Sequence, residues 1–402
     1  MQQLINQIPT NKKMNSKERV TRAFAHKEPD RVPIFELTID NPTAKHVLGR
    51  DNLCGFGGMV RGARQNEALG NGRIHQYHQQ RIADEIELWQ TLDLDVYPNA
   101  YPVLKNPLVP EQIDEHTWRF TDPATGQWGI SRYSPASDTY DQIDSSIRQD
   151  GLDALRIQTE AMEAATPSLD DWDFTPVKTF VCELGQDRFV MGAADVEIGS
   201  TWDWAEHFLM GLLLDPELIH RYLDARLRIT LMLLEETLKL GVDGIHGGYD
   251  WASARGPMFS PKHFDTFVFP RLKQIADLCH QYGVPYVKHT DGNVNKLLDG
   301  MIAAGVDGFQ AIEPRANMDI AQIKQTHGDK LTLIGNVDCS TVLVDGPVAA
   351  VKAQTEQVIR AAAPGGGFIL STSNSVHPGV KPDYYLAMLE TARAVGIYPI
   401  EP

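Results

Sequence analysis

The second half of the chain repeats one pattern, in which a short apolar run ends in polar residues and an amphipathic segment of helical length follows. Runs of this kind occupy residues 242–250, 284–293, 306–314, 331–338 and 367–374. Such alternation predicts parallel strands joined by helical crossovers. Similar runs near residues 34, 95 and 191 raise the number of expected strands to the eight of a closed barrel. We therefore predict an α/β fold, a TIM-type (β/α)8 barrel with its chemistry at the carboxyl ends of the strands.

N-terminal helices are expected to precede and follow the first strand. The first of them is expected from Met14 to His26, with Asn15-Ser16 as its cap and Glu18 in its first turn. A further helix is expected over residues 74–92. The residues before the first helix are polar, so residues 1–14 are predicted to be a flexible segment and residues 15–402 a single barrel domain.

Two regions do not follow the alternation of strands and helices that is expected of a barrel. Residues 42–73 are rich in glycine and polar residues and have no clear period, which predicts a loop over the barrel mouth. Residues from about 101 to 143 contain prolines, Thr125-Gly126 and Trp128-Gly129-Ile130, which are typical of hairpins. We expect a small antiparallel hairpin insertion there.

Charge and composition narrow the classes of partner. The formal net charge is −16, and because nucleic acids and anionic membranes attract positive surfaces, neither is expected as a partner. We find no apolar run of ~18 residues and no signal segment, so a cytoplasmic location is expected. The four cysteines are widely spaced, which is typical of a reducing compartment. An exposed apolar helix face would allow a homodimer, but periodicity does not distinguish such a face from core.

The strand expected at residues 284–289 ends in the most chemically suggestive residues of the chain. On a strand, residues two apart face the same way, so His289 and Asp291 are expected to point together from its end. Glu313 ends the next strand. We predict His289, Asp291 and Glu313 as metal ligands and catalytic groups. The alternatives are that the first two merely orient a loop and that Glu313 pairs with Lys288 or Arg315.

Other polar and aromatic residues are placed near the expected barrel mouth. Asn336 ends one late strand, and Asn374 and His377 follow the last strand near the usual anion-binding end of a barrel, so we predict these three as cofactor-binding residues. A set of tryptophans would form an aromatic wall for a planar ligand, although such residues are more often core. They are Trp202, Trp204 and Trp251.

Several short sequence motifs follow one another along the chain. They are Arg19 to Ala25, Glu28-Pro29-Asp30-Arg31-Val32-Pro33, Arg255-Gly256-Pro257 with Ser260-Pro261, Phe269-Pro270-Arg271-Leu272-Lys273, His289-Thr290-Asp291-Gly292-Asn293, Gly335-Asn336-Val337-Asp338 and Pro364 to Leu370. With these motifs the chain resembles the uroporphyrinogen decarboxylase superfamily over nearly its whole length, the hairpin insertion and the first dozen residues excepted. Taken together the motifs are specific to the superfamily.

The resemblance implies one of two chemistries. True uroporphyrinogen decarboxylases need no cofactor and hold a substrate with many carboxylates through an arginine-rich segment just after the first strand. Here that segment, residues 35–42, contains no arginine. An acidic lining would repel such a substrate by several kcal/mol where it is poorly screened. We therefore do not expect a true uroporphyrinogen decarboxylase.

The other branch comprises methyltransferases that move a methyl group to or from a corrinoid. In the coenzyme M type, a zinc is bound by a His-x-Cys motif and a later cysteine. The histidine matches His289, but the first cysteine is replaced by Asp291 and the later one falls around Ser373-Asn374-Ser375. Oxygen ligands leave zinc more electrophilic, which suits an ether oxygen better than a thiol. Alternatively, the site has lost its metal.

The resemblance also marks Tyr249 and Asp250, where the superfamily places substrate-contacting residues, and we predict both as catalytic residues. Their alternative role is to pair with Arg255 or to cap the following turn. We predict a substrate-specific methyltransferase of a corrinoid-dependent O-demethylation system, with zinc, a small methylated compound such as an aryl methyl ether, and a separate corrinoid protein. The first alternative is a metal-free decarboxylase or lyase in which Asp291, Asp250 or Tyr249 handles the proton. The second is a non-catalytic ligand-binding or corrinoid-delivery protein.

Overall fold

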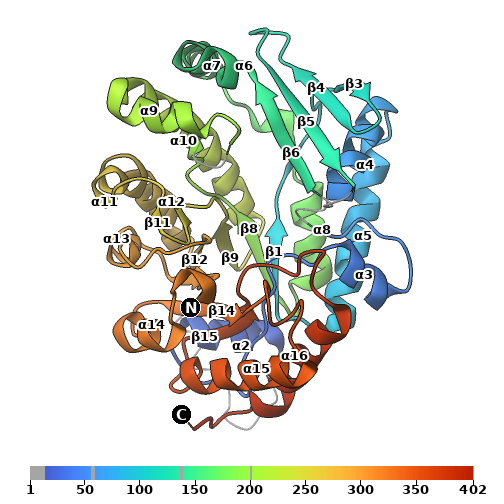
Figure 1. Cartoon of the computed structure of the whole chain (residues 1–402), viewed down its shortest axis with the longest axis vertical. Helices are drawn as coiled ribbons and strands as arrows, with labels where there is room; N and C mark the ends of the chain where they lie inside the picture. The colour runs from blue at the N-terminus through green and yellow to red at the C-terminus, as the bar shows by residue number, and fades with distance from the viewer. Residues whose placement is uncertain (1–13, 56–58, 136–138, 200–201, 402) are drawn as a thin grey trace.

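The structure is a computed structural model that describes residues 14–55, 59–135, 139–199 and 202–401. Within them, seven parallel strands form one curled sheet (Figure 1). In spatial order they are β1 (Val96–Ala100), β8 (Phe189–Ala193), β9 (Gly244–Gly247), β12 (Tyr286–His289), β13 (Gly308–Gln310), β14 (Thr332–Val337) and β15 (Phe368–Thr372). Residues 34 and 35 close the barrel, because Ile34 bridges Leu370 in β15 and Phe35 bridges Val96 in β1. The predicted (β/α)8 barrel is therefore confirmed, with residues 34–35 as its eighth strand.

Helices surround the sheet, as its parallel connections require. They are α5 (Ile74–Leu92), α7 (Leu152–Ala164), α8 (Thr175–Leu184), α9 (Ala205–Leu214), α10 (Pro216–Lys239), α12 (Phe269–Gln281), α13 (Leu298–Ala303), α14 (Ile320–His327), α15 (Val348–Ala362) and α16 (Pro382–Val395). Shorter elements in the connections are α6 (Ser146–Asp150), η1 (Leu169–Asp171), β10 (Ala252–Ser253), β11 (Gly256–Pro257), α11 (Pro261–His263), η3 (Phe264–Val268) and η4 (Pro314–Ala316). No helix in the described part of the chain has both the length and the apolar character to cross a membrane.

The predicted first helix is present as α2 (Ser16–Phe24) and closes the amino-terminal end of the barrel. Asn15 Oδ1 accepts the backbone N–H of Glu18 at 2.8 Å, and the Glu18 carboxylate accepts that of Asn15 at 2.9 Å. This capping box stabilises the first turn. Phe24 stacks on Phe189 with ring centroids 5.6 Å apart and joins a cluster that fills the barrel interior below the site.

Two expectations about the connections were wrong. Residues 42–73 are not a loop, because they contain most of α3 (Asn41–Leu48) and all of α4 (Met59–Gly70). Pro42 lies in the first turn of α3 and Gly49 ends it with φ 67°. The residues that suggested a loop therefore mark the ends of a helix. After the polar turn at residues 290–293 the sequence also predicts a helix from near Val294, but α13 begins at Leu298.

The predicted antiparallel insertion is confirmed and continues to Ser145. In the described residues it is a four-stranded sheet of β3 (Glu111–Asp114), β4 (Thr117–Thr121), β5 (Trp128–Ser134) and β6 (Thr139–Ser145). Separately, β2 (Val103–Leu104) pairs with β7 (Trp172–Asp173). Figure 1 shows the sheet at the top of the molecule, on the side toward which β1 runs. The expected flexible segment, residues 1–14, lies outside the described residues except for Met14, and the division into domains stays a prediction.

Candidate metal and active site

Three acidic or imidazole side chains converge at the carboxyl ends of two neighbouring strands. His289 is the last residue of β12, Asp291 follows it by two residues, and Asp250 follows β9. In the described part of the chain, one ligand atom from each of the three lies within 4.8 Å of the others. Because β9 and β12 pair in parallel, their ends bring these residues to one edge of the barrel. Asp250 Oδ1 also accepts the backbone N–H of Asp291 at 2.8 Å, which fixes the two loops together.

The orientation of the His289 ring decides what this cluster can bind. Nδ1 of His289 contacts Oε1 of Gln310, whose Nε2 donates to the carbonyl of Asn374 at 3.1 Å. Since the amide N–H group is used by that carbonyl, Oε1 faces His289 and Nδ1 carries the ring proton. Nε2 then faces the two carboxylates, 3.5 Å from Asp250 Oδ1 and 3.9 Å from Asp291 Oδ1, and in the neutral ring it presents its lone pair there.

The two carboxylate oxygens of Asp291 differ in their hydrogen bonding. Asn374 Nδ2 donates to its Oδ2, whereas its Oδ1 is buried and has no hydrogen-bond partner among the described residues. Burial raises the pKa of Asp291 to about 6; Asp250 and Glu313 add to the shift and His289 opposes it. A buried carboxylate oxygen without a donor is costly, so this position calls for a proton or a cation.

The donor set fits a divalent metal. It offers one imidazole nitrogen and two carboxylate oxygens, which are ligand types that zinc accepts, and Gln310 orients the imidazole as outer ligands do in metal sites. No cysteine belongs to the three-residue set within the described residues. Cys339 is buried, with its Sγ 3.4 Å from Ser373 Oγ. A zinc ion bound by these nitrogen and oxygen ligands would be a harder Lewis acid than one bound by several thiolates.

The other two predicted catalytic residues lie beside the cluster. Glu313 Oε2 accepts the backbone N–H of Gly292 at 3.0 Å, so its carboxylate supports the turn that follows Asp291. Asp250 rather than Glu313 completes the set of three ligand atoms. Tyr249 is held through its backbone, where Asp195 accepts its N–H at 2.8 Å and Lys288 donates to its carbonyl at 2.6 Å.

The three predicted cofactor-binding residues have different hydrogen-bond partners. Asn374 contacts Asp291 directly. Asn336 donates to the carbonyl of Ile312 at 2.7 Å, and its Oδ1 is buried without a partner among the described residues. His377 Nε2 lies 2.9 Å from the carbonyl of Cys339 and is thus engaged by backbone.

Sequence reasoning missed two residues that organise the site. Gln310 is the last residue of β13 and lies in register with His289, so a polar residue ending a buried strand was the available signal. Lys288 follows Tyr286 and Val287 in the buried strand β12 and is itself fully buried. Its Nζ lies 2.5 Å from Asp195 Oδ2 and 4.3 Å from the ring centroid of Trp251.

The comparisons with known proteins agree with this architecture. A family model described as Uroporphyrinogen decarboxylase (URO-D) matches residues 193–395, which is half of the chain. The chain belongs to the uroporphyrinogen decarboxylase family. The matched part contains all strands from β9 to β15 and all three residues of the cluster.

Curated relatives in this family carry two different names. A uroporphyrinogen decarboxylase of Alkalilimnicola ehrlichii is 29% identical over 245 residues, which are 60% of this chain and 62% of the relative. The methylcobamide:CoM methyltransferase MtaA of Methanosarcina barkeri is 25% identical over 191 residues, 46% of this chain and 54% of that protein. The chain thus spans about half to three fifths of the length of the curated relatives it matches.

A solved structure extends the likeness to nearly the whole chain. A methyltransferase from Methanosarcina mazei has a TM-score of 0.66 and covers 95% of this chain and 99% of its own, at 18% identity. At 18% sequence identity, this likeness shows a shared fold and nothing more specific. The barrel fold thus extends over the N-terminal half, which the family model does not match.

Proposed function

We propose that the protein is the substrate-specific methyltransferase of a corrinoid-dependent demethylation system. Its substrate would be a small methylated compound such as an aryl methyl ether, and a separate corrinoid protein would accept the methyl group. The observation that carries the proposal is the meeting of His289 Nε2 with two carboxylates, one of which keeps a buried oxygen without a hydrogen-bond donor among the described residues. The methyltransferase names among its relatives support the same choice.

The residues of the cluster would hold a zinc ion, with Asp250, His289 and Asp291 as ligands. A zinc held there would withdraw charge from the heteroatom that leaves when the methyl group is transferred. Gln310 fixes the imidazole, and Asn374 fixes the Asp291 carboxylate. The barrel mouth would orient the methyl carbon toward its acceptor, since positioning accounts for much of the rate in a displacement reaction.

A metal-free decarboxylase or lyase is the second candidate. It is favoured by the decarboxylase names of other relatives and by the pKa of Asp291, which at about 6 allows that carboxyl to carry a proton near neutral pH. Against it stands the acidic lining of the site, which would repel a substrate with several carboxylates.

Metal content is the measurement that tests the proposal first. The tag-free protein, offered zinc and purified without chelator, is expected to contain about one zinc per chain, and His289→Ala to contain almost none. His280→Ala is the matched control, because His280 is exposed and bonds Asp307 outside the cluster. Equal zinc in the parent and His289→Ala would contradict the metal site.

Activity then distinguishes the two candidates. With cob(I)alamin and an aryl methyl ether, the parent is expected to form methylcobalamin and the phenol, and His289→Ala to form neither. Release of CO2 from carboxylated compounds by a metal-free parent, without methyl transfer, would establish the lyase instead.

Gln310→Leu is expected to weaken zinc binding by about 10- to 100-fold while leaving the stoichiometry at saturation unchanged. The physical reason is that leucine removes the acceptor that holds the Nδ1 proton of His289. Competition with a chelator of known affinity measures the change. Gln310→Glu keeps an acceptor oxygen and should retain most of the affinity; if Gln310→Leu bound zinc as tightly as the parent, the ring would be oriented by something else.

A further inference from the structure

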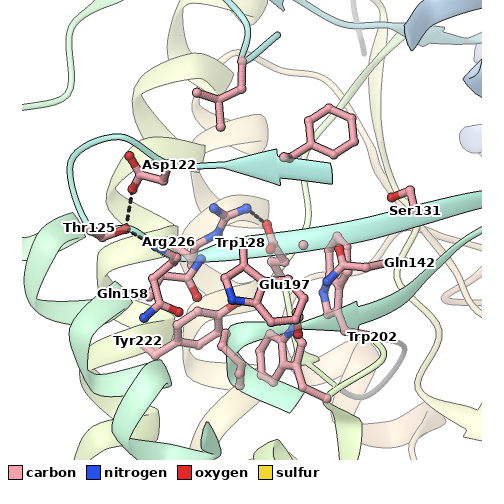
Figure 2. Close-up of a pocket in the computed structure, with 17 residues that line it drawn as sticks. Asp122, Thr125, Trp128, Ser131, Gln142, Gln158, Glu197, Trp202, Tyr222 and Arg226 are labelled. Atoms are coloured by element: carbon pink, nitrogen blue, oxygen red, sulfur yellow. Dashed lines mark hydrogen bonds and ion pairs between the residues drawn. The ribbon is translucent and has the colours of Figure 1, made fainter. Parts of the chain in front are cut away.

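A second hollow lies away from the metal cluster, between the antiparallel sheet, α7, α10 and the loop after β8. Figure 2 shows the residues that line it. Its volume is about 350 Å³, and none of the three cluster residues belongs to its described lining. Ligand cavities are typically roughly 300–1,000 Å³, and one of about 150 Å³ already admits benzene. This hollow, called the aromatic cavity below, has room for one substituted ring.

Its walls are aromatic faces from three separate parts of the fold. Trp128 comes from β5, Trp204 from the loop after β8 and Tyr222 from α10. The guanidinium of Arg119 lies 4.7 Å from the centre of Trp128, which fixes that indole, and Trp204 meets Tyr222 edge-on at 5.8 Å. Rigid aromatic surfaces of this kind bind flat rings through stacked and edge-to-face contacts.

Two buried polar atoms of the lining residues lack partners. Nε1 of Trp202 is a donor and Oε1 of Gln158 is an acceptor, and neither has a hydrogen bond among the described residues. Leaving such a group unsatisfied is unfavourable, so a ligand that provides the missing partner gains from it. Because both atoms are enclosed, the side chains of Trp202 and Gln158 would turn toward the aromatic cavity for one acceptor and one donor on the ligand to satisfy them.

Of the charged side chains around the aromatic cavity, two form an ion pair and one accepts a hydrogen bond. Arg226 pairs with Glu197, and burial lowers the pKa of Arg226. Asp122 Oδ2 accepts the hydroxyl of Thr125 at 2.7 Å. Figure 2 draws both contacts as dashed lines. Because Arg226 already has a counterion, an anionic ligand would lose its hydration without gaining a partner.

We propose that the aromatic cavity binds an uncharged planar ring that carries one hydrogen-bond acceptor and one donor, such as an aromatic amide. This site is separate from the metal cluster and does not depend on methyl transfer. The loop after β8 connects the two places: Glu197 lines the aromatic cavity, and Asp195, two residues earlier, accepts the backbone N–H of Tyr249 next to Asp250.

Three small probes of similar size test the class of ligand by calorimetry at millimolar concentration. Benzamide, which is planar and neutral and has both polar groups, is expected to bind. Benzoate replaces the amide by a charge, and cyclohexanecarboxamide keeps the amide but loses the flat ring. Both are expected to bind at least about tenfold more weakly, a difference of about 1.4 kcal/mol. Equal affinity for all three, or no binding of benzamide, would overturn the proposal.

Variants locate the bound probe. Trp202→Phe keeps a ring but removes the Nε1 donor, and Gln158→Leu removes the acceptor; each is expected to weaken benzamide binding about three- to tenfold. Trp172→Phe is the control, since Trp172 lies in β7 and does not line the aromatic cavity. His289→Ala should bind benzamide as the parent does, whether or not the protein transfers methyl groups. Loss of binding in His289→Ala alone would place the ring at the metal cluster and refute the inference.

Discussion

Lys288→Met is expected to lower the free energy of unfolding by about 3–5 kcal/mol. The Lys288 ammonium is fully buried and lies 2.5 Å from Asp195 Oδ2, whose side chain is 3% exposed. Burial lowers the pKa of Lys288, and Asp195 opposes that shift. Methionine fills a similar volume but leaves the Asp195 carboxylate buried without its cation, and that uncompensated charge is the source of the loss.

Urea unfolding of the parent and of a small variant set measures the effect. Lys273→Met is the matched control, because Lys273 forms an exposed pair with Asp277 at 2.7 Å and its loss should cost at most about 1 kcal/mol. The double variant Lys288→Met/Asp195→Asn removes both charges and should be clearly more stable than the sum of the two single changes predicts. Strict additivity would mean that the pair contributes no coupling.

The same pair links stability to the site. Lys288 also donates to the carbonyl of Tyr249, and Asp195 accepts the N–H of Tyr249, so both partners hold the residue that precedes Asp250. A cation is needed here because the Asp195 carboxylate and the Tyr249 carbonyl present oxygens to the same point. The buried lysine thus fixes the loop that supplies one of the three proposed metal ligands.

The barrel could be predicted from the sequence because its signal is periodic and repeated. Apolar runs such as residues 331–338 and 367–374 became β14 and β15, whose residues are all buried, as expected for parallel strands that are covered on both faces. The connections were harder, since a proline can begin a helix and a glycine can end one, as Pro42 and Gly49 do in α3. Local composition there is the same for a loop and for a short helix.

The candidate site could be predicted where it depends on one strand and not where it depends on several. His289 and Asp291 lie two apart at the end of β12, so their convergence follows from the period of a strand. Whether Asp250 or Glu313 joins them depends on loop conformations after β9 and β13, which no local pattern specifies. The contact between Gln310 and His289 requires the register of β12 against β13.

Glu36→Gln is expected to remove a pH dependence of stability that the parent owes to one buried carboxyl. Burial of Glu36 raises its pKa from 4.5 to about 8, although a hydrogen bond of 2.6 Å from Thr372 Oγ1 opposes the shift. Between these two pH values the folded state keeps a proton that the unfolded state has released. Stability from this group is therefore complete below about pH 4.5 and is lost as the pH rises toward about 8.

Glutamine resembles the protonated carboxyl and does not titrate, so Glu36→Gln should match the parent near pH 5 and exceed it at higher pH. The gain in free energy of unfolding, variant minus parent, should reach about 4 kcal/mol at pH 8. Denaturant unfolding at several pH values measures this gain. Subtracting the parent's free energy of unfolding from that of the variant removes the contributions of the other titrating groups. Glu356→Gln is the control, because Glu356 is exposed and pairs with Arg360 at 2.9 Å. Parallel curves for the parent and Glu36→Gln would show that Glu36 is already ionised in the folded protein at neutral pH.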